Sequence, residues 1–397
     1  MELHTLESRL QALAVFRSLL SDPVMEALLA CLAHNIDGAT WDALGAYGEF
    51  AARLYRGGGD LTRYVQRLVE EDDNVCIRAA GRGETPPAYL TDSVAEELKT
   101  LQMAADLTPE ALTLPLLRTY QSYLPRFGTS EIDLAALYRQ RLENVGRCGW
   151  GVYASHHMFC LDGEGRIVPV GHPDAICLED LVGYERERGL VLDNLRALLE
   201  GRSAANMLLT GDAGTGKSST VKAAGNALKG EGLRIIEVRR DQLGHIPALL
   251  DELSGNPLKF ILFIDDLSFR KDDDSYSALK AVLEGSVSAR SRNVILCATS
   301  NRRHIVKEKF SDREGDDVHR NDAMQETVSL ADRFGLHVTF QRPGKDGFLA
   351  IVHALAQRQG VDGPEVDAAA ERFALLRGGR SPRLARQFVD GLTAVGP

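Results

Sequence analysis

The sequence predicts an α/β fold in which a parallel five-stranded sheet is flanked by helices, with a helical lid after it and a mostly helical domain before it. Three observations support this prediction. From about residue 178 onward, short apolar runs alternate with helix-forming stretches, which is typical of a parallel sheet. One apolar run leads directly into a glycine-rich loop, and another ends in two aspartates.

The chain is expected to divide into four parts. We place a mostly helical N-terminal domain at 1–145, a β-hairpin linker at 146–177, an αβα domain at 178–342 and a helical lid at 343–397. In the first part, Leu6, Leu10 and Leu13 recur at helical spacing. In the second part, two short β-patterned runs flank a turn that contains Asp162 and Gly165, which predicts a hairpin.

The αβα domain contains the alternating pattern. Strands are predicted at 206–210, 233–238, 260–265, 293–299 and 337–341. Helices are predicted between them, at roughly 184–200, 217–229, 241–254 and 275–285. After Pro343 apolar residues again recur at helical spacing, and a last helix is predicted from about Pro382 to Leu392. These helices form the predicted lid.

Residues 211–218 read Gly-Asp-Ala-Gly-Thr-Gly-Lys-Ser, between a predicted strand and a predicted helix. Glycines let successive backbone N–H groups curl around phosphate oxygens, and the helix directs its positive end toward them. In this pattern the lysine reaches the β- and γ-phosphates of a nucleoside triphosphate, and the serine hydroxyl ligates Mg²⁺. The residues expected to bind the nucleotide here are Gly211, Asp212, Ala213, Gly214, Thr215, Gly216, Lys217, Ser218 and Ser219.

A second candidate element is the apolar run 259–264, which is followed by Asp265 and Asp266. Two aspartates after a strand more often form an ordinary solvated turn, but the glycine-rich loop upstream favours a metal site. Asp265 is expected to hold Mg²⁺ through water. Asp266 is expected to orient or deprotonate the attacking water.

Two more polar residues lie at positions where side chains are expected to contact a bound triphosphate. Asn301 follows the strand predicted at 293–299, where its amide would hold the attacking water or the γ-phosphate. An asparagine in a strand-end turn is the alternative. Arg333 precedes the last predicted strand, where in a ring it would reach the nucleotide of a neighbouring copy. Such an arginine can raise the rate by roughly 10³ to 10⁵, whereas a surface salt bridge is the alternative.

Together these residues resemble the AAA+ superfamily of ATPases, and the resemblance covers roughly residues 178–397. The loop 211–218 is similar to the Walker A motif, and residues 263–266 are similar to the Walker B motif. Asn301 resembles sensor 1. Arg333 resembles the arginine finger, and Arg383 resembles the sensor 2 arginine of the lid. Val182, Gly183 and Tyr184 resemble the segment that lines the adenine pocket. The resemblance implies that ATP and Mg²⁺ are the cofactors, and that the αβα domain binds the nucleotide.

Three longer strings narrow the resemblance. Residues 264–269, 298–304 and 329–336 are similar to those of a bacterial family of AAA+ ATP-binding proteins of unknown function. Most AAA+ motors have Asp-Glu where this chain has Asp-Asp, and an aspartate reaches less far toward the water, so slow hydrolysis is expected. Protein-threading members carry an aromatic loop after the second strand. The corresponding residues 239–245 contain no aromatic residue, which disfavours an unfoldase.

The composition is that of a globular protein, with 44% hydrophobic and 26% charged residues. The formal net charge of -10 disfavours a protein that coats nucleic acid, because a polyanion needs a basic surface. No run of about 18 apolar residues occurs, and the cysteines form no Cys-x-x-Cys pair. We therefore expect a cytoplasmic protein without a membrane partner. The group Cys148, His156, His157 and Cys160 fits no common zinc spacing.

The leading hypothesis is a Mg²⁺-dependent AAA+ protein that binds ATP and ADP and hydrolyses ATP. Rearrangement of a homo-oligomer, either a ring or a transient assembly, would remodel an unknown cytoplasmic protein client. One alternative is a DnaA- or DnaC-like loader linked to DNA, which the Asp-Asp pair and the arginines at 302–303 favour and the acidic N-terminal part disfavours. Another is an ATP-binding switch or scaffold with little turnover, which Asn301, Arg333 and Arg383 disfavour. The charged stretch 311–322 is expected to be a loop.

Overall fold

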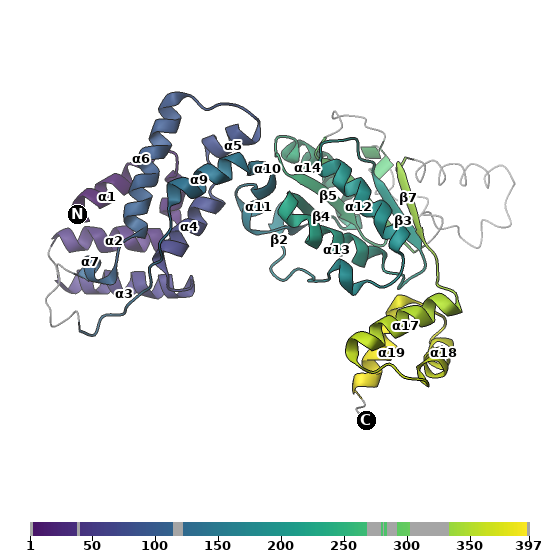
Figure 1. Ribbon diagram of the computed structural model, residues 1–397. Coiled ribbons are helices and arrows are strands. Elements are labelled where there is room, and N and C mark those ends of the chain that lie inside the picture. Colours follow the sequence, from purple (N-terminus) through teal and green to yellow (C-terminus); the bar gives the residue numbers. More distant parts are fainter. Residues whose placement is uncertain are drawn as a thin grey trace. The chain divides into compact units, whose positions relative to one another are not determined.

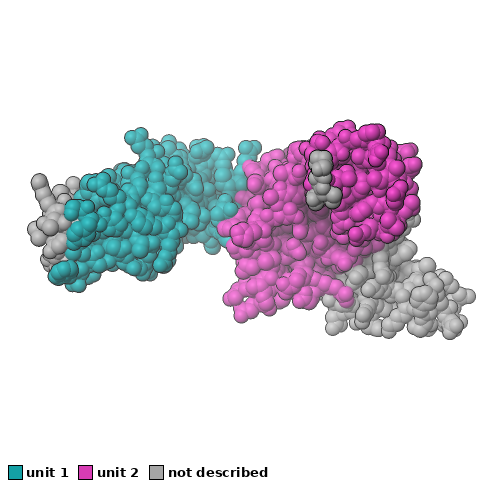
Figure 2. Space-filling view, turned by 90° about the horizontal axis from the view of Figure 1, so that it is seen from below, with its two compact units in different colours: residues 1–155 teal, residues 156–397 magenta. Residues whose placement is uncertain are grey.

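Two units make up the chain, at residues 1–155 and 156–397 (Figure 2). The computed structural model describes residues 3–37, 40–113, 122–267, 279–280, 282–283, 292–301 and 333–394. In this described part, no helix is long and apolar enough to cross a membrane.

The first unit is helical, as the leucine spacing predicts. Its core contains large side chains such as Phe16, Phe50 and Leu54. Side chains of Asp60 and Asn74 accept backbone N–H groups at the starts of two helices, which satisfies donors that have no partner within the helix. The helices are α1 (Leu3–Gln11), α2 (Pro23–Asp37), α3 (Thr40–Arg56), α4 (Leu61–Glu71), α5 (Val75–Gly81), α6 (Ala88–Ala105), α7 (Pro109–Thr113), α9 (Leu134–Glu143), α10 (Val145–Cys148) and α11 (Val152–Ser155), with the 3-10 turn η1 (Arg17–Ser21).

The second unit contains one sheet with helices packed on it (Figure 1). In the described residues the strand order is β2-β1-β4-β5-β6-β3-β7, and all neighbours are parallel except β2 and β1. The predicted fold class is confirmed. The strands are β1 (Met158–Leu161), β2 (Ile167–Pro169), β3 (Met207–Gly211), β4 (Leu233–Glu237), β5 (Lys259–Ile264), β6 (Val294–Ser300) and β7 (Leu336–Phe340).

The predicted hairpin adds β1 and β2 to the five strands that the sequence predicts. β1 pairs with β4, so that Met158 lies opposite Ile235. The buried side chain of Gln242 donates to the carbonyl oxygens of Leu161 and Asp162, at 3.2 and 2.9 Å. Gln242 lies in the 3-10 turn η4 (Arg240–His245), which follows β4. The hairpin is therefore part of the sheet and is fixed to the segment after β4.

Helices cover the sheet because the central strands are apolar on both faces. α12 (Glu185–Leu199) and α13 (Lys217–Leu228) contribute Val191, Leu195 and Val221 to a core shared with Leu209 and Phe263 of the sheet. α14 (Ile246–Leu253) follows η4, while η2 (Leu178–Asp180) and η3 (Lys229–Glu231) are short connecting turns. The helix predicted at 275–285 falls outside the described residues except at 279–280 and 282–283, which are helical, and the stretch 311–322 falls outside them entirely.

The predicted lid is a group of three helices after β7. They are α17 (Lys345–Gln359), α18 (Val366–Leu376) and α19 (Pro382–Ala394). Phe348, Val352, Ala370 and Val389 form their shared core. On the lid surface the ring of His353 lies between two carboxylates, with Nδ1 2.7 Å from Asp362 and Nε2 2.6 Å from Asp367. We therefore expect the stability of the lid to depend on pH.

The hydrogen bond with Asp362 is the first cause that raises the pKa of His353 above its ordinary value, and the bond with Asp367 adds to it. Stabilisation is therefore fully present below the unfolded pKa, about 6.5, and is lost as pH rises through the higher folded pKa. We expect His353→Gln to lower the thermal midpoint more at about pH 6 than at about pH 9. His172→Gln, at an exposed histidine of the same unit, is the control. Equal losses at both pH values would contradict the assignment.

Candidate nucleotide-binding site

Parallel strand pairing brings the candidate residues to one edge of the sheet. β5, β6 and β3 are neighbours, so their carboxyl ends lie side by side. The register pairs Ile264 with Ala298 and Thr210 with Ser300. The acid pair, Asn301 and the glycine-rich loop begin directly after these residues, and they therefore leave the sheet at adjacent points.

The loop has a backbone that glycine adopts more readily than other residues. Gly211, Gly214 and Gly216 have φ values of 139°, 80° and 93°. A Cβ on Gly211 would lie 2.0 Å from the carbonyl oxygen of Phe340 in β7. Gly216 is the N-cap of α13, so the first N–H groups of that helix lie at the loop. This backbone fits a phosphate group, because it gathers the first N–H groups of α13 at the positive end of that helix.

Lys217 lies at the mouth of the loop with its ammonium group held by oxygen atoms. Nζ donates to the carbonyl oxygens of Gly211 and Asp212, both at 2.8 Å, and to Oδ1 of Asn301 at 3.0 Å. Burial lowers the pKa of the Lys217 ammonium, and the nearby acidic groups oppose that effect. The geometry places a desolvated positive charge between the loop and the end of β6.

Asp265 has one carboxylate oxygen that accepts three hydrogen bonds. The donors to Oδ1 are the hydroxyl of Ser218 at 2.6 Å, the hydroxyl of Thr299 and the backbone N–H of Asp266 at 3.1 Å. No residue in the described ranges donates to the other oxygen, Oδ2. The serine after the loop lysine and the first acid after β5 therefore meet directly.

The second acid points to a different partner. Asp266 has φ of 52°, which is uncommon for a residue with a side chain. Its Oδ1 accepts a hydrogen bond of 2.8 Å from Nδ2 of Asn301. Because Oδ1 of Asn301 accepts from Lys217, the amide connects the loop lysine with the second acid. Asp266 after β5, Asn301 after β6 and Lys217 at the start of α13 thus form one hydrogen-bonded path.

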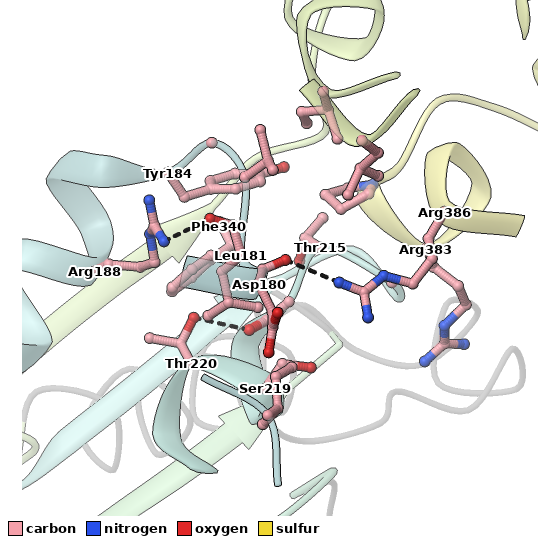
Figure 3. A pocket seen from close by; sticks show the side chains of 18 residues that line it. Asp180, Leu181, Tyr184, Arg188, Thr215, Ser219, Thr220, Phe340, Arg383 and Arg386 are labelled. Carbon is pink, nitrogen blue, oxygen red and sulfur yellow. Dashed lines mark hydrogen bonds between the residues drawn. The ribbon is translucent and has the colours of Figure 1, made fainter. Parts of the chain in front are cut away.

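A pocket with a cavity volume of about 210 Å³ lies between the loop and the lid (Figure 3). Gly214, Thr215, Gly216 and Ser219 line it from the loop side, and Ile351 lines it from α17. Asp212 and Ala213 are exposed. The residues that line this pocket do not include these two, nor Gly211, Lys217 and Ser218.

The segment 182–184 lies between the sheet and the lid and also lines the pocket. Val182 packs against the lid core, and a Cβ on Gly183 would lie 3.4 Å from Ile351. The hydroxyl of Tyr184 donates to the carbonyl oxygen of Gln341 at 2.6 Å, and burial raises its pKa to about 12. The ring lies 5.3 Å from that of Phe340. These contacts leave apolar walls suited to a flat aromatic base.

Two lid arginines reach the pocket from α19. The backbone N–H of Arg383 donates to the carbonyl oxygen of Gly214 at 3.2 Å, and the side chain of Arg386 donates to that of Asp180 at 2.8 Å. Figure 3 shows both arginines on the lid side of the pocket. Arg333 occupies the turn before β7 and is not one of the residues that line the pocket. The residues just before it lie outside the described part of the chain.

Sequence analysis missed several residues of this region, including Thr299, Arg188 and Arg386. Thr299 is buried and touches the acid pair, and Arg188 and Arg386 line the pocket. The threonine-serine pair directly before Asn301 is a weak sequence signal for Thr299. Arg386 lies one helical turn after Arg383, so its position on the same face of α19 was accessible from the helical period.

The donor set fits a hard cation together with phosphate. Ser218 and Asp265 supply oxygen atoms, which Mg²⁺ prefers, and the loop supplies N–H groups and a lysine for phosphate. In the described residues no cluster of three or more His, Cys, Asp or Glu side chains could hold a metal by itself. A cation here would therefore take its other ligands from phosphate and water, as Mg²⁺ usually does.

The family comparison matches residues 154–395 to the family described as "Protein of unknown function (DUF815)". The chain belongs to this family. Its second unit has the arrangement that the AAA+ resemblance implies: the loop follows a central strand, the acid pair and the asparagine follow two neighbouring strands, and lid helices line the pocket. No curated protein matches the sequence.

Solved structures with some similarity include a RuvB mutant and a nucleotide-bound DnaA. A mutant of RuvB from Thermotoga maritima has a TM-score of 0.38 and 18% identity, over 56% of this chain and 67% of that chain. AMPPCP-bound DnaA from Aquifex aeolicus has a TM-score of 0.38 and 17% identity, over 57% of this chain and 67% of that chain. The chain thus spans about two thirds of the length of these proteins.

The contact between Gly211 and β7 generates a stability prediction. We expect Gly211→Ala to lower the free energy of unfolding by at least about 2 kcal/mol, because the new Cβ clashes with a backbone oxygen and the φ is unfavourable. Gly230→Ala, where a Cβ meets no atom within 4 Å, should change it by less than about 0.5 kcal/mol. Urea denaturation of the full chain measures both. Equal stability of the two variants would contradict the observed packing.

Proposed function

We propose that this protein is a Mg²⁺-dependent ATPase that binds ATP between the glycine-rich loop and the lid and hydrolyses it slowly. The observation that carries the proposal is the hydrogen-bonded path from Lys217 through Asn301 to Asp266, beside the contact of Ser218 with Asp265. It joins a phosphate-binding group, a cation-binding pair and a potential general base in one place. A solvated turn would not need these groups to meet.

The loop and Lys217 would bind the triphosphate. Phosphate oxygens would replace the carbonyl and amide oxygens that now accept from Nζ, so the lysine would exchange neutral acceptors for charged ones. Ser218 and Asp265 would hold Mg²⁺. When bound, this ion neutralises charge on the β- and γ-phosphate oxygens.

Asp266 would act on the attacking water. Its carboxylate is held by the amide of Asn301, which leaves the carboxylate able to accept a proton while the amide orients the water or the γ-phosphate. The aspartate side chain is one methylene shorter than glutamate, so we infer a longer approach to the water and a low turnover rate. This agrees with a protein that responds to nucleotide state rather than cycling rapidly.

The lid would respond to the nucleotide. Arg383 lies at the start of α19, whose first N–H already binds the loop at Gly214, so its side chain can reach the phosphates from the lid side. The apolar walls at Tyr184 and Phe340 would enclose adenine. We infer that ATP binding draws the lid toward the loop.

We further infer a cytoplasmic homo-oligomer in which Arg333 completes the site of a neighbouring copy. The position of Arg333, outside the pocket of its own chain, supports this proposal. Rearrangement of the subunits would then act on a protein client. Stimulation of turnover by single-stranded DNA that disappears at raised salt would instead favour a DNA-linked loader.

Variants of Lys217 and Asp266 separate binding from chemistry. We expect Lys217→Ala to weaken ATP binding strongly, because it removes the charge that pairs with the phosphates. Asp266→Asn should retain ATP binding in calorimetry while turnover falls by about 10² to 10⁴, the range for a lost general base. Asp241→Asn, at an exposed acid in η4, is the control. Wild-type turnover in Asp266→Asn would overturn the assigned role.

Arg333→Ala tests the shared site. Specific ATPase activity of the wild type should rise with protein concentration, since two copies build each site. The variant should lose about 10³-fold or more in turnover and keep its ATP affinity. Arg202→Ala, at an exposed arginine after α12, should behave as wild type. Activity that is independent of both concentration and Arg333 would indicate a monomeric site.

A further inference from the structure

Thr299 contacts the acid pair, but the proposed function assigns it no role. It is a buried residue near the end of β6, with 2% of its surface exposed. Its hydroxyl donates to Oδ1 of Asp265 and accepts the backbone N–H of Asp266 at 3.0 Å. Its carbonyl oxygen accepts the N–H of Leu267 at 2.7 Å. One residue of β6 therefore binds three consecutive residues that follow β5.

The turn after β5 needs such support. Asp266 has φ of 52°, a left-handed conformation that side chains disfavour and that persists only where surrounding contacts hold it. The backbone N–H of Asp266 itself donates a hydrogen bond to the hydroxyl of Thr299. A hydroxyl is the smallest group that can donate to one neighbour and accept from the next. Valine has the same shape and can do neither.

The conformation of this turn separates the two acids. Oδ1 of Asp265 faces Ser218, and the carboxylate of Asp266 faces Asn301. Because Thr299 and Ser218 both occupy Oδ1 of Asp265, the other oxygen is left without a donor from the described residues. The hydroxyl of Thr299 thus holds Oδ1 of Asp265 at the position where it meets Ser218.

We propose that Thr299 is a positioning residue that fixes the turn of the acid pair, so that Asp265 serves the cation while Asp266 stays with Asn301. This inference rests on the proposed ATP and Mg²⁺ site and names a residue that controls its metal dependence. Groups that orient metal ligands typically contribute tenfold to a hundredfold to metal affinity. The effect is therefore expected on the benefit that Mg²⁺ gives to ATP binding, more than on ATP binding without metal.

The test compares Thr299→Val, Thr299→Ser and Thr299→Ala with the wild type in the full chain. Binding of a fluorescent ATP analogue is measured with Mg²⁺ and with a chelator. Hydrogen exchange of the amides at 266 and 267 is measured in the nucleotide-free protein. Thr210→Val is the matched control, because Thr210 is a buried threonine of β3 whose hydroxyl contacts His337 and Thr339 and no acid.

We expect Thr299→Val and Thr299→Ala to lose about tenfold or more of the Mg²⁺-dependent gain in affinity and to exchange these amides faster. Thr299→Ser should stay within about threefold of wild type in both measurements, because it keeps the hydroxyl. The proposal is overturned if Thr299→Val keeps the full Mg²⁺ effect, or if Thr299→Ser is impaired as much as Thr299→Ala. If Thr299→Val does not fold, the Ser and Ala pair still decides.

Failure of the proposed function gives a different result. In that case the wild type itself would bind no ATP analogue with or without Mg²⁺, whereas amide exchange would still show whether Thr299 holds the turn. Unchanged exchange in Thr299→Val and Thr299→Ala would then overturn the positioning role independently of any nucleotide.

Discussion

Parallel pairing of β5, β6 and β3 is the constraint on which the candidate site depends. Each strand ends at the same edge of the sheet, so the acid pair, Asn301 and the loop that leads to Lys217 begin at adjacent points. The distances among Lys217, Asn301 and Asp266, between 2.8 and 3.0 Å, follow from that register. A slip of one residue in β6 would reverse the faces on which Thr299 and Ser300 lie and would separate these groups.

Backbone conformations supply the rest of the geometry. Gly211 can leave β3 beside the carbonyl oxygen of Phe340 because it has no Cβ. Asp266 adopts a left-handed conformation with a side chain present, and the hydroxyl of Thr299 holds its N–H. Strain of this kind is typically kept only where surrounding contacts determine it. The glycine-rich loop thus keeps its conformation because a side chain is absent at Gly211, whereas the acid pair keeps its conformation through a hydrogen bond from Asp266 to Thr299.

The lid extends the site beyond the sheet. Tyr184, on the segment before α12, reaches the carbonyl oxygen of Gln341, and Arg383 reaches Gly214 through its backbone. Both contacts join parts of the second unit that are far apart in sequence. Arg342 adds an ion pair of 3.6 Å with Asp212 across the same region, although both side chains are about half exposed, so its contribution to stability is small. Movement of the lid would change the contact of Arg383 with Gly214, whereas Gln341 and Arg342 precede the lid helices.

The sequence by itself determined the α/β fold, the five central strands and the lid, because apolar periodicity and glycine-rich turns are local signals. The loop, the acid pair and Asn301 were also predictable, since each lies directly after a predicted strand. Tertiary structure alone decided that the hairpin joins the sheet through Met158 and β4, and that Thr299 supports Asp266. Both depend on which strands become neighbours, and local periodicity carries no information about strand order or register.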